Sequence, residues 1–155
     1  MKIRFLITVF LSVNCFMFSQ LPCPLQSGIK KISIPPESGL FRGCIPDRTK
    51  NRISSESNKV ISLSDGKVSS ILVHRDNTKS LLIRSDNDHF FIYSNLDKIF
   101  FNTKDKVEKD QILGTALPDV ENEANFLLDF EFWIKTEPIE VVLNCKKPIN
   151  ERPLP

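Results

Sequence analysis

The sequence predicts an all-β domain of mostly antiparallel strands, folded as a sandwich or a partly closed barrel. Short apolar runs alternate with clusters of turn residues, and no convincing helical segment lies between them. The runs 71–73, 81–83 and 90–92 are apolar on consecutive residues, so both faces of these strands should be covered. The alternative is an α+β fold in which residues 117–126 form a short helix.

The expected strands follow one another closely from residue 59 onwards. Asp65-Gly66, a dipeptide typical of a hairpin turn, separates a strand at 60–63 from one at 68–73. Polar clusters at 75–78 and 85–88 predict two further turns. The remaining strands are expected at 80–84, 89–93, 97–101, 111–115, 125–134 and 139–143.

Length and composition limit the class of protein. The chain has 155 residues, 41% of them hydrophobic, which suits one globular domain. Its 21 Lys and Arg residues against 19 Asp and Glu residues give a net charge of +2. This balance lacks the dense basic field that nucleic-acid binding requires, so we expect no nucleic-acid partner.

The first 20 residues have the pattern of a signal peptide. Lys2 and Arg4 precede an apolar stretch that runs to Phe18, close to the lower length limit of a membrane span. We expect an exported protein, periplasmic or secreted, without stable membrane insertion after signal removal; a retained membrane anchor is the alternative. The expected divisions are a signal peptide at 1–20, an irregular proline-rich lead segment at 21–58, the β domain at 59–145 and an extended tail at 146–155.

Export would place the cysteines where disulfides form. Removal of the signal leaves Cys23, Cys44 and Cys145. We expect a bond between Cys44 and Cys145, which would tie the lead segment to the end of the core, and one odd thiol. The sequence does not determine this connectivity.

Four segments, taken in order, carry a family resemblance. Residues 60–68 look like a strand, an Asp-Gly turn and a second strand, and residues 93–96 look like a Tyr-Ala-His-Leu segment. Residues 104–114 look like a Gly-Asp-x-Val-x-x-Gly-Gln-x-Ile-Gly run, and residues 127–131 look like a His-Leu-His-Phe-Glu strand. Together they resemble the LytM/lysostaphin family of secreted zinc metallopeptidases, whose fold, the duplicated hybrid motif, is of the barrel-sandwich hybrid type.

The resemblance also shows where the zinc ligands of this family are missing. It places a His-x-x-x-Asp ligand segment at residues 48–54, which contain no histidine or carboxylate. It places the third ligand at Asp129, and it places Leu127 and Asn95 where the family has two further histidines. One carboxylate does not hold zinc against water, so we expect no metal, no cofactor and no catalytic residue.

The two histidines of the chain offer one other route to a metal site. His74 and His89 each lie at an expected strand edge beside a turn, where we expect surface polar residues. A site recruited from His74, His89 and Asp129 is conceivable, with a geometry different from that of the family.

The family's glycines and the strand at 125–134 give further expectations. Two glycines of the family's turn correspond to Lys104 and Asp110, so a left-handed backbone there must be adopted by non-glycine residues. On the strand, Asp129 and Glu131 share a face that should be solvated, and Trp133 is the best candidate for an exposed contact. The residues of opposite parity that should pack in the core are Phe126, Phe130 and Phe132.

By resemblance, degenerate members of the family act as scaffolds or regulators of the cell envelope. We therefore expect an exported, catalytically degenerate peptidase-like domain that binds peptidoglycan peptides or an envelope protein such as a cell-wall hydrolase. If the resemblance holds, Asn95, Leu127, Asp129 and residues 48–54 should surround one cleft. The residues expected to form the binding groove are Tyr93, Asn95, Asp129, Glu131 and Trp133.

Two alternative functions stay open. The first is an active zinc metalloendopeptidase of the cell wall with non-standard ligands. The second is an adaptor of an envelope complex, because residues 104–114 also resemble the hairpin of lipoyl and biotinyl domains. Neither Lys106 nor Lys109, however, lies in the Asp-Lys-Ala type of turn that carries the modified lysine in those domains.

Overall fold

The computed structural model describes residues 20–31 and 50–146. Residues 1–19 of the expected signal peptide, Cys44 and the end of the expected tail lie outside these ranges. In the described part of the chain, no helix has the length and apolar character needed to cross a membrane. The elements are β1 (Leu21–Pro22), β2 (Ile29–Lys31), β3 (Asn51–Ser55), β4 (Lys59–Ile61), β5 (Gly66–Val73), β6 (Lys79–Arg84), the 3-10 helix η1 (Asp86–Asp88), β7 (His89–Ile99), β8 (Lys106–Val107), β9 (Ile112–Pro118), β10 (Phe126–Ile134), β11 (Glu137–Ile139) and β12 (Leu143–Asn144).

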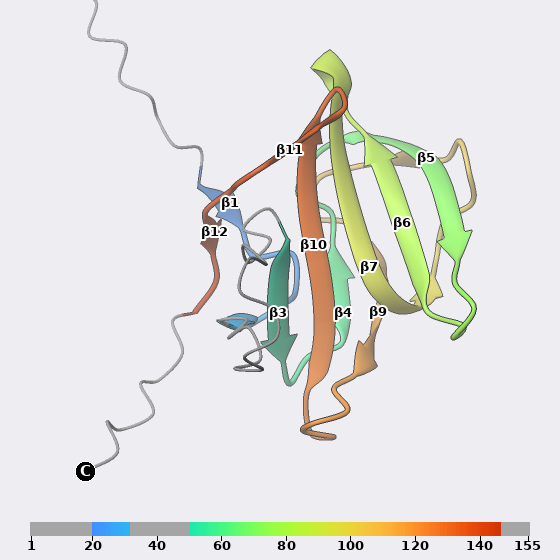
Figure 1. The fold of residues 1–155 in the computed structure, drawn as a ribbon. Helices are drawn as coiled ribbons and strands as arrows, with labels where there is room; N and C mark the ends of the chain where they lie inside the picture. Colours follow the sequence, from blue (N-terminus) through green and yellow to red (C-terminus); the bar gives the residue numbers. More distant parts are fainter. Residues whose placement is uncertain (1–19, 32–49, 147–155) are drawn as a thin grey trace, which may run out of the picture.

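One sheet contains ten of these strands, and all of its strand pairings are antiparallel. Its order is β2-β3-β10-β9-β7-β6-β5-β8, with β4 paired to β9, β11 paired to β10, and β10 also paired to β7. Figure 1 shows β10, β7, β6 and β5 side by side, with β3 flanking β10. The prediction of an all-β, mostly antiparallel fold is confirmed, and the sheet is not closed into a barrel. The alternative helix at 117–126 is wrong, because β9 extends to Pro118 and a loop follows.

Alternation along β10 separates a core face from the opposite face of the sheet. Leu128 and Phe130 are fully buried, and Phe126 and Phe132 pack against the same apolar cluster. The prediction that the three phenylalanines of this strand pack in the core is therefore confirmed. The alternate residues, which include Asp129, lie on the other side of the sheet. We call that side the open face.

The Asp65-Gly66 dipeptide does not close a hairpin, so that prediction is wrong. β4 pairs with β9, whereas β5 pairs with β6 and β8. Pairing between distant segments overrides the local turn signal here. Gly66 is needed for another reason: a Cβ at this position would lie 2.6 Å from the carbonyl oxygen of Arg84 on the neighbouring strand.

The strands expected at 89–93 and 97–101 are one continuous strand, β7. Its first half pairs with β6 and β10, and its second half pairs with β9. Asn95 lies at the junction with a φ of 66°, a left-handed conformation that asparagine tolerates better than most residues. β7 thus changes partners near this residue without ending.

The lead segment at 21–58 was expected to be irregular, but part of it forms strands of the sheet. Residues 51–55 form β3, which pairs with β10 and contributes the fully buried Ile53 to the core. Residues 29–31 form β2, which pairs with β3. Four of the five residues of β3 are buried, and most of them are polar. Polar and apolar residues therefore do not alternate along β3, and the strand shows no period-2 pattern.

The disulfide joins Cys23 to Cys145, not Cys44 to Cys145 as expected. β1 and β12 form a parallel pair at the two ends of the domain, which brings the two Cα atoms within 4.8 Å. The bond spans 122 residues of sequence. In the chain-entropy account, a cross-link closing so long a loop removes much of the freedom of the unfolded chain.

The turn around β8 keeps the backbone that the family builds with glycine. Lys104 has a φ of 79° and Asp110 a φ of 65°, so both residues adopt the left-handed conformation. The Lys104 amide donates to the Val68 carbonyl at 2.8 Å, and the Asp110 amide donates to the Ser62 carbonyl at 2.9 Å. These contacts hold the two residues in a conformation that costs a non-glycine residue about 1–2 kcal/mol.

Candidate functional site

A groove crosses the open face of the sheet. It consists of two adjoining hollows of about 610 and 650 Å³, which share Asp76, Thr78 and Asn95. The first is also lined by Lys31, Arg52, Leu117, Pro118, Asp119, Val120, Glu121 and Leu127. The second is also lined by Lys50, His74, Arg75, Ser80, Ser94, Asp129 and Glu131. The structure thus brings Asn95, Leu127, Asp129 and part of the 48–54 segment around one cleft, as the resemblance requires.

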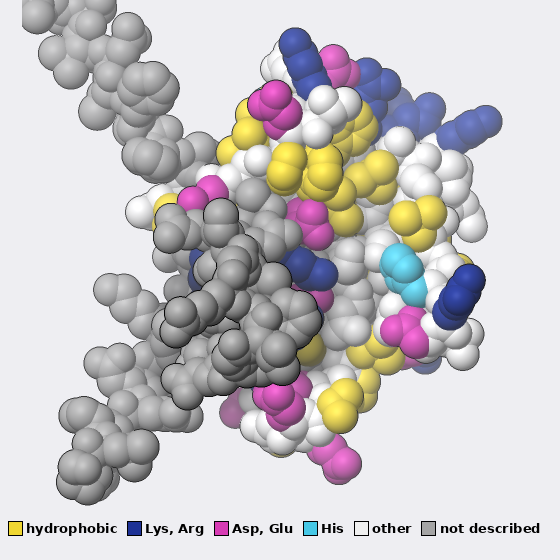
Figure 2. Space-filling model, viewed as in Figure 1, with side chains coloured by type: hydrophobic (Ala, Val, Ile, Leu, Met, Phe, Trp, Pro, Cys, Tyr) yellow, Lys and Arg dark blue, Asp and Glu magenta, His cyan; other side chains and the backbone are white. Residues whose placement is uncertain are grey.

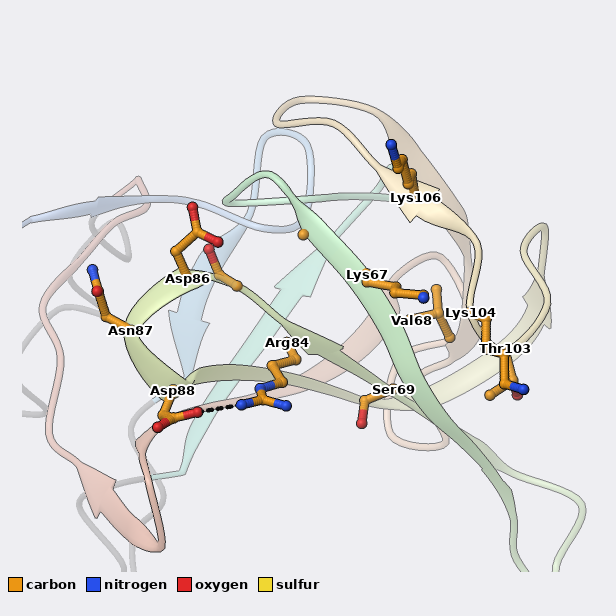
Figure 3. Close-up of a pocket in the computed structure, with 12 residues that line it drawn as sticks. Lys67, Val68, Ser69, Arg84, Asp86, Asn87, Asp88, Thr103, Lys104 and Lys106 are labelled. Atoms are coloured by element: carbon orange, nitrogen blue, oxygen red, sulfur yellow. Dashed lines mark hydrogen bonds and ion pairs between the residues drawn. The ribbon is translucent and has the colours of Figure 1, made fainter.

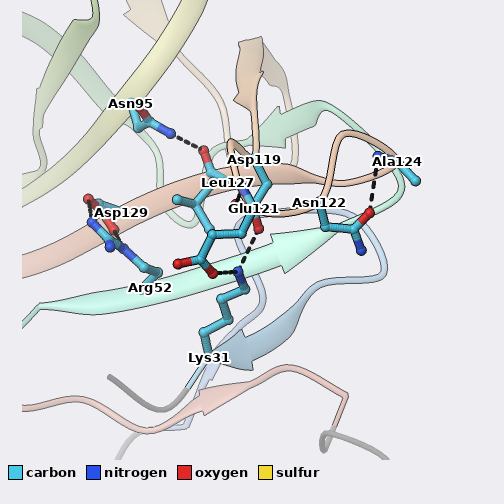
Figure 4. Close-up of polar contacts among 9 residues, drawn as sticks. All are labelled: Lys31, Arg52, Asn95, Asp119, Glu121, Asn122, Ala124, Leu127 and Asp129. Atoms are coloured by element: carbon cyan, nitrogen blue, oxygen red, sulfur yellow. Dashed lines mark hydrogen bonds and ion pairs between the residues drawn. The ribbon is translucent and has the colours of Figure 1, made fainter. Parts of the chain in front are cut away.

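An ion pair occupies the centre of this groove. Arg52 of β3 stands directly opposite Asp129 of β10 in the strand register. Its Nε and Nη2 atoms donate to the two Asp129 carboxylate oxygens at 2.8 and 3.0 Å (Figure 4). The Lys50 Nζ lies 3.4 Å from Asp129 Oδ2. Asp129 is only 6% exposed, so the expectation of a solvated carboxylate is wrong. The hydrogen bond to Asp129 also raises the pKa of the Arg52 guanidinium.

Asn95 links the two central strands beside this pair. Its Nδ2 atom donates to the carbonyl oxygen of Leu127 at 2.7 Å. The amide therefore crosses from β7 to β10 at the position where the resemblance places a histidine. Leu127 contributes its backbone carbonyl to this contact, and its side chain carries no metal-binding atom.

A second ion pair closes the end of the groove near the β9–β10 loop. Lys31 Nζ donates to Asp119 Oδ2 at 2.6 Å and lies 3.4 Å from Glu121 Oε2. Its hydrogen bond lowers the pKa of the buried Asp119 carboxyl, and the same bond raises the pKa of Lys31. The contact fastens β2 to the loop after β9.

The two histidines lie in different environments. His74 is exposed, and its Nε2 atom is 2.8 Å from Ser80 Oγ, which in turn donates to Ser94 Oγ at 2.9 Å. His89 is half-buried, and its ring packs edge-on against Phe132, with ring centroids 5.4 Å apart. Because Phe132 packs against the core and Asp129 lies on the open face, the structure does not bring His74, His89 and Asp129 together.

The groove residues expected from the sequence divide into two groups. Asn95, Asp129 and Glu131 line the groove, and Trp133 lies on the same face of β10, half-buried, with its indole N–H donating to Glu131 Oε2 at 3.0 Å. Tyr93 does not line the groove and that expectation is wrong. It is fully buried in the core, and its hydroxyl accepts a hydrogen bond from the Leu63 amide. Burial raises the pKa of this phenol.

Sequence reasoning missed the cations of the groove. Residues 48–54 were expected to matter only through the absence of ligands, whereas Lys50 and Arg52 supply positive charge to Asp129. Lys31 and Asp119 were also missed. A register in which Arg52 faces Asp129 would have revealed the first pair, but it depends on a strand that the sequence does not show.

These residues do not fit a zinc ion. Both carboxylate oxygens of Asp129 already accept hydrogen bonds from a guanidinium, and that cation would repel a metal ion at the same place. Among the residues that the structure describes, no group of three or more His, Cys, Asp or Glu side chains is placed to hold a metal ion. The groove offers hydrogen-bonding and charged groups.

The fold and the site define a protein with a single large antiparallel sheet and an ion pair in the groove on its open face. The model of the family described as "Peptidase family M23" matches residues 52–141, more than half of the chain. The chain belongs to this family, which confirms the resemblance to LytM-type peptidases. No curated protein matches the sequence.

Solved structures support the same fold. A zinc-containing peptidase from Vibrio cholerae is 21% identical with a TM-score of 0.52, over 65% of this chain and 31% of that one. A putative peptidase M23 from Pseudomonas aeruginosa is 13% identical with a TM-score of 0.58, over 81% and 48%. A chain of the SpoIIIAH and SpoIIQ complex is 11% identical with a TM-score of 0.58, over 78% and 96%. The match thus spans about a third of the Vibrio chain and nearly all of the chain in the complex.

Proposed function

We propose that this protein is a non-catalytic, exported binding module of the M23 family. Its groove holds an extended peptide of the cell envelope, from peptidoglycan or from a protein partner. The observation that carries the proposal is the Arg52–Asp129 pair, which uses the one carboxylate at a family ligand position to bind a guanidinium. A hydrolase of this type needs that position for a metal and its activated water.

The rest of the groove supports binding without chemistry. Its walls offer carboxylates, ammonium groups, hydroxyls and an amide, which are polar groups that can orient a bound peptide. Asp76 at the rim accepts hydrogen bonds from the Thr78 amide and hydroxyl, which orders the turn between β5 and β6 and lowers the pKa of Asp76. A similar fold in the SpoIIIAH and SpoIIQ complex supports a protein partner for this one.

The test combines metal content, cleavage and binding. The protein purified without added zinc should hold far less than one zinc per chain and should not cleave purified peptidoglycan with or without zinc. Soluble stem peptides released from peptidoglycan are the binding probe. Thr78→Trp, which fills the centre of the groove, should abolish their binding, whereas Thr136→Trp, the same change at an exposed turn, should not.

Two outcomes would contradict the proposal. Stoichiometric zinc together with peptidoglycan cleavage would show an active metalloendopeptidase. Stem-peptide binding that survives Thr78→Trp would show that the groove is not the binding site. If stem peptides do not bind at all, a photo-crosslinking residue at position 78 should capture a protein segment in envelope preparations, and absence of that adduct as well would reject the groove.

A further inference from the structure

A row of side chains crosses the open face at the end of the strands away from the β9–β10 loop. The register pairs Lys106 of β8 with Lys67 of β5, Lys67 with Arg84 of β6, Arg84 with Phe90 of β7, and Phe90 with Trp133 of β10. Neighbours in register point to the same side of a sheet. The row therefore consists of a cationic part, Lys106, Lys67 and Arg84, and an aromatic part, Phe90 and Trp133.

The cationic part is unfavourable for the fold itself. Like charges directly opposite on neighbouring strands destabilise a sheet, and Lys67 has a cation opposite it on both sides. Within the described residues, Lys67 and Lys106 form no ion pair, whereas Arg84 pairs with Asp88 and lies 5.8 Å from the centroid of the Phe90 ring. Lys67 of β5 and Lys106 of β8 thus carry positive charge that no ion pair among the described residues offsets.

These cations line a cavity of their own. A hollow of about 700 Å³ is bounded by Lys67, Arg84, Lys104 and Lys106, with hydroxyls from Ser69 and Thr103. Figure 3 shows the cationic side chains around it, with Arg84 turned toward Asp88. Lys104 reaches the cavity from a left-handed backbone position that would suit glycine better. In Figure 2, Lys and Arg side chains gather along the upper right edge, beside a cluster of hydrophobic side chains.

The dimensions and charges of the row indicate which kind of ligand would fit it. Five strands at a spacing of about 4.8 Å give the row a length of about 19 Å, which matches about six residues of extended chain. Asp86 and Asp88 line the same cavity, and the Arg84–Asp88 pair shows that a cation of the row accepts a carboxylate. Carboxylates at one end and an aromatic side chain at the other would satisfy both parts of the row.

We propose that this row binds an extended acidic segment of a partner protein, with its carboxylates on Lys106, Lys67 and Arg84 and an aromatic side chain on Phe90 and Trp133. The basic cavity shares no lining residue with the groove, although the two sites adjoin where the Trp133 indole N–H donates to Glu131. The proposal therefore does not depend on what the groove binds.

The experiment uses the full chain and the peptide acetyl-Asp-Glu-Asp-Ser-Phe-Phe-amide. Trp133 is the single tryptophan of the sequence, so its fluorescence reports binding at the aromatic part of the row. We expect a change in emission that saturates with peptide and weakens steeply with added salt. The neutral peptide acetyl-Asn-Gln-Asn-Ser-Phe-Phe-amide should bind at least about tenfold more weakly, since the charged contacts are lost.

Variants distinguish the row from general positive charge. Lys67→Glu/Lys106→Glu should lower the affinity for the acidic peptide by at least about tenfold. The matched control Lys59→Glu/Lys98→Glu makes the same charge change at two exposed lysines outside the cavity and should alter affinity less than about twofold. Thr78→Phe, which fills the groove without adding a second tryptophan, should leave acidic-peptide binding unchanged.

Three results would overturn the proposal. Equal affinity for the neutral peptide would remove the role of the carboxylates. Unchanged binding by Lys67→Glu/Lys106→Glu, in a variant that melts cooperatively, would remove the role of the row. Tighter row-dependent binding of hexametaphosphate, or of vesicles containing phosphatidylglycerol, than of the peptide would assign the site to a phosphate polymer or a membrane instead.

Discussion

The open face carries two sets of charged cross-strand neighbours: one set pairs opposite charges, and the other pairs like charges. In the groove, Asp129 faces Arg52 and the opposite charges form a bidentate pair. At the other end of the strands, Lys67 faces Lys106 on one side and Arg84 on the other. A sheet gains from the first arrangement and loses from the second. In the first set the charges neutralise each other within the protein, whereas in the second set the lysine charges remain available to a ligand.

The first set explains how this face of the sheet tolerates a buried carboxylate. A buried carboxylate left alone would be costly, because its desolvation has no compensation. Arg52 supplies that compensation from β3, and Lys50 adds a second cation at 3.4 Å. The two cations thus neutralise Asp129 within the groove.

The largest expected effect comes from breaking the groove pair. Arg52→Ala leaves the 6% exposed Asp129 carboxylate with only the more distant Lys50. We expect a loss of about 2–3 kcal/mol in the free energy of unfolding, below the about 3–5 kcal/mol of a fully buried pair because the Arg52 side chain is half exposed. Urea unfolding monitored by Trp133 fluorescence measures this loss.

A double variant tests whether the loss reflects an unpaired charge. Arg52→Leu/Asp129→Leu removes both charges and should be less destabilising than Arg52→Ala, since no buried carboxylate is left without a partner. If the double variant loses the sum of the two single losses, Arg52 and Asp129 are not energetically coupled and the comparison between the two sets fails.

The Lys31–Asp119 pair gives a smaller effect that depends on pH. The pKa of Asp119 is lowered in the folded protein, so its contribution is present above the ordinary carboxyl pKa and is lost as the pH falls through the folded value. The pKa of Lys31 is raised, so its contribution is present below the ordinary lysine pKa and is lost as the pH rises through the folded value. We expect Asp119→Asn to lower the free energy of unfolding by about 1–2 kcal/mol at pH 7. Below pH 4, the free energy of unfolding should fall less in this variant than in the wild type, because the variant has no carboxylate to protonate.

This acid dependence is measured by urea unfolding at pH 7, 5, 4 and 3 for both proteins. Asp86→Asn, at an exposed carboxyl in the basic cavity, is the matched control and should leave the pH dependence nearly unchanged. If the free energy of unfolding falls equally with pH in the wild type and in Asp119→Asn, the pair does not contribute to the loss of stability in acid.

Local patterns in the sequence predict the strands and the core but not the pairings. Parity along β10 places Phe126, Phe130 and Phe132 in the core, as the structure confirms. The same parity rule applied to β7 would have buried Tyr93 beside Phe91, whereas the family motif suggested a groove position. Where the motif and the alternation disagreed, the alternation was right.

The failures share one physical cause, which is contact between distant segments. Cys145 bonds to Cys23 because β1 pairs with β12, and no local signal marks two-residue strands. Arg52 reaches Asp129 because β3 pairs with β10 across more than 70 residues. Both the disulfide and the groove pair depend on register, which a single sequence does not encode in any short window.

The smallest expected effect has the opposite sign and tests the second set directly. Lys67→Glu places a carboxylate between Lys106 and Arg84, so two like-charge neighbours become two opposite-charge neighbours. We expect a gain of about 0.5–1 kcal/mol in the free energy of unfolding at low salt, declining as salt is added. Lys98→Glu, at an exposed position of β7, should change stability by less than about 0.5 kcal/mol. A protein that becomes more stable as it loses its acidic ligand would show that the cationic row is kept for binding, whereas a destabilised Lys67→Glu variant would show that the fold itself needs the lysine.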